Sequence, residues 1–383
     1  MFVAHVLHHL VIGGMENGVV NLINRLPSDR FRHAVVCIED YSEFRDRIKT
    51  HGVEVHALHR SQIGVTRMRW QLFKLFRMWR PDIVHSRNLS GLDSLLPARL
   101  AGAVTLHSEH GFDVDNLDGR GRKQALLRRL HAPLIKHFVT VSGHLRQALV
   151  EFQGVDPARV THICNGVDTS AFAPAAVPTE RQLLPPAFRD ADCYVIGTVG
   201  RVRPIKDQIT LIRAVGRLIQ SDPSMARRLR LVVVGDGPTL SALREEAGKL
   251  GIDELTWFPG ARHDVAMLMQ TLDLFVLPSL NEGISNTLLE AMSTGIPTLA
   301  TAVGGNLELI EPGETGATFQ PGDVVGLAAL LARYVADRAM STRQGVAARE
   351  HVLRKFSLQT MMAGYQDVYE TLKADHVRHH RHL

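Results

Sequence analysis

Two glutamates, Glu282 and Glu290, stand where carboxylates could contact a bound ligand. They follow the apolar run at 274–277, which predicts a strand, and open parallel sheets bind ligands beyond the carboxyl ends of their strands. Ser285 or Asn286 can cap the helix that follows, and the N-terminal end of a helix suits a phosphate. The Glu290 carboxylate could then accept a hydrogen bond from a ribose hydroxyl. The alternative is that both glutamates are ordinary carboxylates on the surface of a helix.

Two cations lie on a proline-containing loop after another predicted strand. Arg201 and Lys206 are five residues apart, and the loop follows the run at 194–199. A diphosphate leaving group gains negative charge as its bond breaks, so fixed cations here would stabilise its transition state more than its ground state. Arg203, which lies between them in the sequence, is predicted to be a solvated charge of the loop. Taken alone, the pattern is also compatible with a loop whose charges are all solvated.

Glycine turns and one histidine mark three further strand ends. Gly13 and Gly14 follow the first strand, where a backbone without side chains allows a ligand to approach closely. The segment is not GxGxxG, which counts against a dinucleotide site and an oxidoreductase. Gly235 begins a tight turn, 235–238, that could touch a nucleotide, although turn chemistry alone explains it. His110 follows another strand, and among 20 histidines only this context singles it out.

The elements that must position these residues alternate between strands and helices. In the first half, strands are expected at 5–10, 33–38, 53–58, 82–85, 104–108 and 138–142. A proline-rich stretch, 172–188, then indicates a connection between domains. After it, strands are expected at 194–199, 229–235, 255–259, 274–277 and 298–300, and helices at 207–220, 239–250 and 286–294. This order predicts an α/β protein with two parallel sheets covered by helices, and 383 residues suffice for two such domains.

Together these motifs resemble those of a known family. The segment 282–292 resembles the E-x7-E signature of retaining glycosyltransferases of the GT-B fold, and more narrowly of glycosyltransferase family 4, the group 1 transferases. The segment 13–16 resembles the family's GGxE turn, and 109–111 its EHG segment. The resemblance covers nearly the whole chain. The exact residues of 282–292 and 109–111 are most similar to those of bacterial exopolysaccharide transferases, including transferases of PEP-CTERM/exosortase systems.

The resemblance implies a role for each candidate residue. Glu282 would contact the donor sugar, Glu290 would hold the nucleotide ribose, and Arg201 with Lys206 would bind the diphosphate. The implied catalytic residues are Glu282, His110, Arg201 and Lys206. The implied donor-binding residues are Gly13, Gly14, Arg201, Lys206, Gly235, Glu282, Asn286, Thr287, Leu288 and Glu290, with the backbone amides of 286–288 holding phosphate.

The implied architecture is GT-B, two Rossmann-like doubly wound domains facing across a cleft. Residues 1–170 would form an N-terminal acceptor-binding domain, and 171–357 a C-terminal domain that binds the nucleotide-sugar donor. The final helix, 358–372, would pack back on the first domain.

The implied function is retaining transfer of a sugar from a UDP- or GDP-sugar to a saccharide or lipid-linked acceptor, in bacterial exopolysaccharide or cell-surface glycan synthesis. Two alternatives stay open: a GT-B-fold nucleotide-sugar 2-epimerase, and a non-catalytic nucleotide-sugar-binding protein. The sequence leaves the base, the sugar, the acceptor and the oligomeric state open.

No cofactor or metal is expected, because Arg201 and Lys206 supply positive charge at the diphosphate. Asp113 and Asp115 form a D-x-D in the wrong half of the chain for a donor metal and are assigned to a loop. The terminal cluster of His379, His380 and His382 is assigned to a frayed tail. Three scattered cysteines argue against a disulfide framework or a structural zinc and favour a reducing cytoplasm.

Charge is uneven along the chain. Residues 1–170 hold 22 Lys and Arg against 16 Asp and Glu, whereas the remainder is close to neutral. Two basic amphipathic stretches, 67–80 and 120–137, could lie on anionic lipid, or could be core-facing helices with a solvated basic side. Nucleic acid is not expected, because no recognised reading motif accompanies the charge. No signal or spanning segment is seen, which predicts a cytoplasmic protein, peripheral on the inner face of the membrane if these helices bind lipid.

Overall fold

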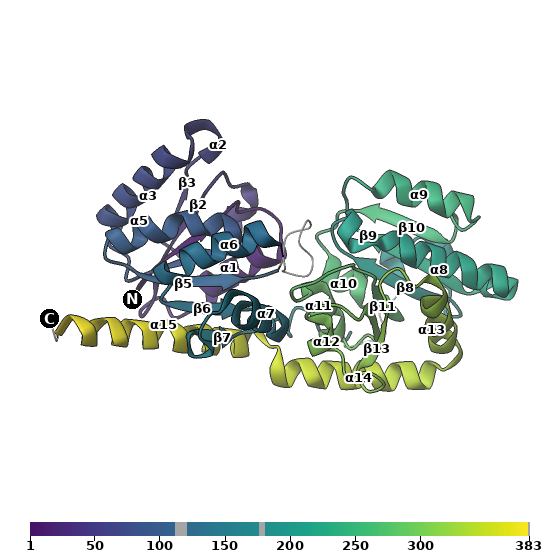
Figure 1. Cartoon of the computed structure of the whole chain (residues 1–383). Coiled ribbons are helices and arrows are strands. Elements are labelled where there is room, and N and C mark those ends of the chain that lie inside the picture. Colours follow the sequence, from purple (N-terminus) through teal and green to yellow (C-terminus); the bar gives the residue numbers. More distant parts are fainter. Residues whose placement is uncertain (112–120, 176–180, 382–383) are drawn as a thin grey trace. The chain divides into compact units, whose positions relative to one another are not determined.

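A computed structural model of the chain describes residues 1–111, 121–175 and 181–381 (Figure 1). The chain forms two compact units, one of Met1–Asn165 with Leu358–Leu383 and one of Gly166–Ser357. Each unit is built on one parallel sheet, which confirms the predicted pair of doubly wound α/β domains. The first unit ends before residue 170, where the sequence placed the boundary.

The first unit has a seven-stranded sheet in the order β3-β2-β1-β4-β5-β6-β7. Most of its strands are almost entirely buried, as expected for a parallel sheet covered on both faces. The strands are β1 (Phe2–Leu7), β2 (Arg32–Cys37), β3 (Glu54–Ala57), β4 (Ile83–Arg87), β5 (Val104–Glu109), β6 (His137–Thr140) and β7 (Val160–His162). The first strand begins before the expected 5–10, and β7 was not expected, because three residues are too few to show a periodic pattern.

Helices cover both faces of this sheet. On one face α1 (Gly14–Arg25) and α15 (Leu358–Arg381) share a core with strand residues such as Val3 and Ile83. On the other face α3 (Val65–Trp79) and α5 (Leu95–Leu100) pack over Val6 and Val84. The chain therefore returns to the first sheet after the second unit is complete. The other described helices of this unit are α2 (Arg60–Ile63), α4 (Asn88–Gly91), α6 (Arg122–His131) and α7 (Gly143–Gln153).

A layer of buried polar side chains lies between the first sheet and α15. Tyr369 of α15 pairs through its hydroxyl with His85 Nδ1 at 2.8 Å, and the buried Arg87 guanidinium approaches His5 Nδ1 at 3.1 Å. His5 in turn pairs with His33 at 3.0 Å. Burial and the charge of Arg87 hold the pKa values of His5 and His85 well below the ordinary range, and that of His33 at about 4. The imidazoles are therefore neutral and can accept hydrogen bonds from Arg87.

The second unit has a six-stranded sheet in the order β10-β9-β8-β11-β12-β13. Its strands are β8 (Tyr194–Val199), β9 (Leu229–Val234), β10 (Thr256–Gly260), β11 (Leu274–Leu277), β12 (Thr298–Thr301) and β13 (Gly316–Phe319). Its helices are α8 (Gln208–Ser221), α9 (Leu240–Lys249), α10 (Val265–Met269), α11 (Asn286–Ser293), α12 (Asn306–Leu309), α13 (Val324–Ala336) and α14 (Arg338–Lys355).

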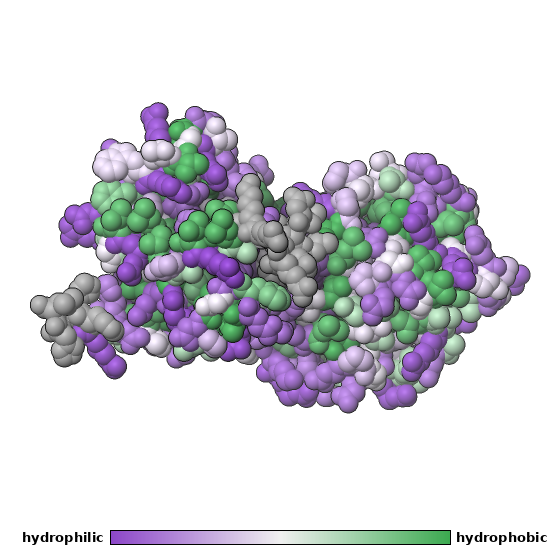
Figure 2. All heavy atoms as spheres, in the orientation of Figure 1, coloured by the Kyte–Doolittle hydropathy of each residue, from purple (hydrophilic) through white to green (hydrophobic). Residues whose placement is uncertain are grey.

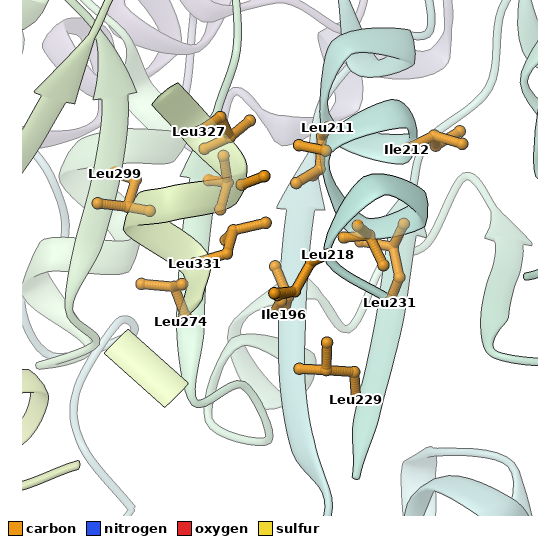
Figure 3. Close-up of a cluster of buried hydrophobic side chains, with 14 of the residues drawn as sticks. Ile196, Leu211, Ile212, Leu218, Leu229, Leu231, Leu274, Leu299, Leu327 and Leu331 are labelled. Atoms are coloured by element: carbon orange, nitrogen blue, oxygen red, sulfur yellow. The ribbon is translucent and has the colours of Figure 1, made fainter. Parts of the chain in front are cut away.

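The core of this unit is aliphatic. Figure 3 shows Ile196 and Leu274 of the sheet packed against Leu211 of α8 and Leu327 and Leu331 of α13. These side chains are fully buried, so the two helices hold one face of the sheet. This packing fixes the positions at which the strands end and the loops beyond them begin.

The buried histidines predict a loss of stability in acid. Because the folded pKa of His33 is about 4, below the ordinary 6.5, the unfolded chain binds its proton first, and the free energy of unfolding falls as pH drops from 6.5 towards 4. Replacing His33 by Gln should reduce this slope by about 1 kcal/mol per pH unit. Urea unfolding at several pH values between neutrality and the acid limit measures it. His51→Gln, at an exposed turn, is the control, and equal slopes in all three proteins would contradict the prediction.

Candidate functional site

The candidate residues of the second unit meet at the switch point of its sheet. Strands β8 and β11 are neighbours, and the chain order of the strands reverses between them. The loop after β8 carries Arg201 and Lys206, and the loop after β11 carries Glu282. A backbone hydrogen bond of 2.8 Å from Leu280 N–H to the Ile205 carbonyl joins the two loops. This is the position at which doubly wound sheets bind ligands.

An ion pair connects the two loops. Lys206 Nζ lies 2.5 Å from Glu282 Oε1, and the Ser279 hydroxyl donates to the same oxygen at 2.7 Å. The Lys206 side chain is 25% exposed and that of Glu282 is 9% exposed, so the pair is open to solvent mainly on the side of the lysine. Ser279 is fully buried, and its carbonyl accepts a hydrogen bond from the Thr301 hydroxyl at 2.5 Å. The Glu282 carboxylate is therefore held in one place by two partners.

Sequence reasoning missed Ser279. The residue lies three positions before Glu282, just ahead of the segment that carries the resemblance, and a hydroxyl at that spacing in a turn is a common local hydrogen-bond donor. This spacing was the one signal that could have found it.

Two glycines of the loop after β12 pack against the backbone of Glu282 and Gly283. The Gly305 N–H donates to the Glu282 carbonyl at 3.2 Å. A Cβ at Gly304 would lie 2.0 Å from that same carbonyl oxygen, and one at Gly305 would lie 2.0 Å from the Gly283 carbonyl oxygen. Gly304 also has φ +47°, in the left-handed region that favours glycine. The close approach of these two loops therefore requires both glycines.

Arg201 lies on a loop that packs against the turn after β9. The Val202 N–H donates to the Asp236 carbonyl at 2.9 Å, and a Cβ at Gly235 would lie 1.9 Å from the Gly200 carbonyl oxygen. Gly235 has φ +139°, so both its conformation and its surroundings exclude a side chain. The Arg201 side chain itself is exposed, where it is available to an anion. Gly235 therefore positions the cationic loop, whether or not it also touches a ligand.

Helix α11 follows the loop that carries Glu282. Ser285 is its N-cap and accepts a hydrogen bond from the Leu288 N–H at 3.3 Å, and Asn286 is the first helical residue. The amides of Asn286 and Thr287 belong to the first turn, where the helix itself offers no acceptor. A phosphate that also used the Leu288 amide would have to share it with Ser285. Glu290 is half-buried one turn further along the helix.

In the first unit, Asn88 links the ends of two strands to the start of a helix. Asn88 itself follows β4; its Oδ1 accepts from the backbone N–H of His110, which follows β5, at 2.9 Å, and its Nδ2 lies 3.6 Å from the sulfur of Met15 in the first turn of α1. Asn88 follows β4 with φ +52°, which asparagine tolerates better than most residues. No pattern in the sequence indicated a role for Asn88, because the residues it joins are distant along the chain.

The Gly13–Gly14 turn is filled by its own glutamate. Gly13 is the N-cap of α1, and a Cβ there would lie 2.1 Å from Glu16 Oε2. Gly14 is the first residue of the helix. The end of the Glu16 side chain thus lies over the turn, and because that side chain is flexible it could move aside for a Cβ at position 13.

His110 is a neutral imidazole with unused hydrogen-bonding capacity. In the part of the chain that the structure describes, neither ring nitrogen has a hydrogen-bond partner, and both are buried. Burial and the nearby Arg87 charge lower its pKa to about 3, against the opposing effect of Glu109. Although its burial opposes ionisation, Glu109 is held at a pKa of about 2 by Arg128 and His107. His110 can therefore donate one hydrogen bond to a ligand and accept another.

Several other candidate features are not placed. Asp113 and Asp115 and the side chains of His379, His380 and His382 lie outside the described residues. Elsewhere in the described chain, no group of three or more His, Cys, Asp or Glu side chains is arranged to hold a metal ion. Within the same residues, every helix is too short or too polar to cross a membrane.

Two family models match the chain. "Glycosyltransferase Family 4" matches residues 12–171, and "Glycosyl transferases group 1" matches residues 193–337. The first model covers the Gly13 turn and His110, and the second covers Arg201, Lys206 and Glu282.

Curated relatives agree with these models. A D-inositol 3-phosphate glycosyltransferase of Streptomyces griseus is 31% identical over 330 residues, 78% of this chain and 69% of the relative. Its counterpart in Stackebrandtia nassauensis is 32% identical over 289 residues, and the chain spans only 64% of that relative's length. The Escherichia coli UDP-Gal:alpha-D-GlcNAc-diphosphoundecaprenol alpha-1,3-galactosyltransferase is 25% identical over 96% of both chains. These relatives do not test the narrower likeness to PEP-CTERM/exosortase transferases, which stays a prediction.

Solved structures share the fold. Anabaena Alr3699/HepE in complex with UDP and glucose matches with a TM-score of 0.82 at 21% identity, over 98% of this chain and 100% of that one. Sucrose-phosphate synthase of Thermosynechococcus elongatus matches with a TM-score of 0.78 at 19% identity, over 98% and 99%. The two parallel sheets are thus those of GT-B enzymes, and with both family models matched the chain belongs to the group 1 glycosyltransferases of family 4.

Proposed function

We propose that this protein transfers a sugar from a nucleotide diphosphate-sugar to a saccharide or lipid-linked acceptor, with retention at the anomeric carbon. The observation that carries the proposal is the Lys206–Glu282 ion pair at the switch point of the second sheet. The loop of Lys206 also carries the exposed Arg201, and the loop of Glu282 leads into the N terminus of α11. This arrangement supplies positive charge for a diphosphate and an oriented carboxylate for a sugar.

Each residue has an assigned task in this proposal. Arg201 and Lys206 bind the diphosphate and stabilise the charge that it gains as the glycosidic bond breaks. Glu282 orients the sugar and supports it electrostatically, without forming a covalent bond. Glu290 accepts a hydrogen bond from the ribose. In the first unit, which is assigned to the acceptor, His110 offers its neutral imidazole to a hydroxyl group.

The diphosphate needs no metal in this proposal, because two cations stand on the loop that would hold it. When donor binds, Lys206 exchanges part of its contact with Glu282 for phosphate oxygens, and Ser279 keeps the carboxylate in place. The buried hydroxyl thus preserves the orientation of Glu282 in both states.

The names of two similar proteins favour particular substrates. The Escherichia coli relative is named for a UDP-galactose donor and a diphosphoundecaprenol-linked acceptor, and the Anabaena structure holds UDP and glucose. We therefore favour a UDP-sugar and a lipid-linked saccharide used at the cytoplasmic face of a membrane, in exopolysaccharide or cell-surface glycan synthesis. Product analysis separates this reaction from a 2-epimerase, which needs no acceptor, and from a binding protein, which gives no product.

Nucleotide binding should depend on Arg201. We expect one of UDP, GDP and ADP to raise the unfolding temperature, and the rise to persist with EDTA, because binding to the folded state alone stabilises it. Arg201→Ala should weaken nucleotide affinity by roughly tenfold or more, since a hydrogen bond between charged groups is worth about 1.5–3 kcal/mol. Thermal-shift titration measures this loss.

Arg203→Ala is the matched control, since Arg203 is exposed on the same loop. It should leave the shift unchanged. No shift with any of the three nucleotides, or a shift abolished by EDTA, would contradict the proposed cationic donor site.

Glu282→Gln should impair turnover more than binding. The amide keeps the size of the side chain but removes the charge that Lys206 and Ser279 orient, so we expect kcat to fall by on the order of a hundredfold with little change in the nucleotide affinity. Steady-state kinetics and thermal shift measure the two effects. Glu314→Gln, at an exposed turn, is the control. An unchanged kcat would remove Glu282 from the mechanism.

Gly304→Ala should act through Glu282. Its methyl group would displace the Glu282 carbonyl, so we expect kcat to fall by roughly tenfold or more. Gly313→Ala is a matched control, because Gly313 also has a positive φ, +86°, but a Cβ there meets no atom within 4 Å. Both variants place an alanine in the left-handed region, which costs about 1 kcal/mol in each. This strain is therefore common to the two and does not account for a difference in kcat between them. Equal kcat values in the two would show that the loop does not position Glu282.

A further inference from the structure

Helix α6 exposes its leucines and buries an arginine. Arg128 is 4% exposed and donates to Glu109 at 2.6 Å, whereas Leu126 and Leu130 are 57% and 64% exposed. Successive residues in an α-helix turn by about 100°, so these two leucines lie about 200° from Arg128, on the opposite side. Leu127, 39% exposed, lies around the helix between these two leucines and Arg128. A helix that packed on a core in the usual way would show the reverse arrangement.

The exposed leucines extend onto a second helix. Leu96 and Leu100 of α5 are 47% and 63% exposed and, four residues apart, lie on one side of that helix. Figure 2 shows apolar side chains gathered over α5 and α6 on this face of the first unit. We call this surface, made of Leu96, Leu100, Leu126, Leu127 and Leu130, the leucine face.

The two basic amphipathic stretches, 67–80 and 120–137, differ in whether their apolar side chains are buried. Helix α3, which spans most of 67–80, buries Met68, Leu72 and Phe76 in the core over the sheet. The core-facing alternative therefore holds for this side of α3, while Trp70 and Met78, 55% and 70% exposed, lie outside the core. The leucines of α6, within 120–137, are uncovered in the same unit.

The surroundings of the leucine face are basic. The sequence from 121 to 150 contains no Asp or Glu, and neither does α5. Arg99, Arg129 and Lys136 are exposed next to the leucines in the sequence. An apolar strip with flanking cations fits a surface that is apolar inside and anionic outside.

We propose that the leucine face docks on an anionic lipid bilayer, with its leucines below the headgroups and the flanking cations among the phosphates. This partner goes beyond the transfer reaction, although it agrees with the proposed lipid-linked acceptor. A second copy of the chain fits less well, because a symmetric dimer through this face would bring its own cations against each other. The buried Arg128–Glu109 pair holds α6 in the orientation that keeps the leucines outward.

Cosedimentation with vesicles tests the docking. We expect the full chain to bind vesicles of phosphatidylcholine with phosphatidylglycerol, to bind phosphatidylcholine alone much less, and to be released by high salt. Leu126→Ser/Leu130→Ser should reduce binding to the anionic vesicles by roughly tenfold or more, because it removes most of the inserted apolar area.

The matched control is Val346→Ser/Leu353→Ser, which changes two exposed apolar residues of α14, 55% and 44% exposed, in the second unit. It should bind like the unaltered chain. The nucleotide thermal shift of both double variants should be unaltered, which verifies folding and separates this proposal from that of the donor site. Failure of the unaltered chain to bind anionic vesicles would overturn the proposal, as would full binding by Leu126→Ser/Leu130→Ser. If the unaltered chain forms a dimer that Leu126→Ser/Leu130→Ser disrupts and Val346→Ser/Leu353→Ser does not, the leucine face is a self-association surface and the docking proposal is overturned.

Discussion

The candidate site of the second unit is organised around the ion pair between Lys206 and Glu282. This ion pair joins the loops that follow β8 and β11, two strands that are neighbours in the sheet but far apart in the sequence. Ser279 donates a hydrogen bond to the carboxylate of Glu282. Gly304 and Gly305, which have no side chains, allow the loop after β12 to pack closely against the backbone of Glu282 and Gly283. Each of these contacts requires the strands to end at the right level, which the aliphatic core of α8, α13 and the sheet ensures. Core packing and the polar site are thus parts of one arrangement.

The first unit uses burial for a different purpose. Arg87 and its histidine neighbours form a polar layer that ties α15 to the sheet, and the same burial and positive charge keep His110 neutral. The neutral imidazole of His110, whose ring nitrogens have no hydrogen-bond partner among the described residues, suits contact with a hydroxyl better than contact with a phosphate, whereas the second unit presents cations. The two units therefore differ in the kind of group that each is equipped to hold.

Much of the fold was predictable, because strand and helix periods differ and the alternation of elements restarts midway along the chain. Short elements such as β7 were not predicted, because three residues are too few to show a periodic pattern of apolar side chains. The shared location of Glu282, Lys206 and Arg201 at one sheet edge could be predicted, because all three follow buried strands, and strand ends in a parallel sheet share one edge. Ser279 and Asn88 were not found, because a hydroxyl or amide acquires a role only through the neighbour it meets. The likeness of the stretches 67–80 and 120–137 likewise concealed that one faces a core and the other does not.

Local periodicity and turn residues were enough to predict two doubly wound sheets, the order of their elements and the loops that carry the charged residues. The packing of the elements had to be seen to establish that Lys206 meets Glu282, that Asn88 links two strand ends to α1 and that α6 turns its leucines outward. These are contacts between segments distant along the chain, or the direction in which a helix faces. They depend on how whole elements pack, which no local pattern encodes.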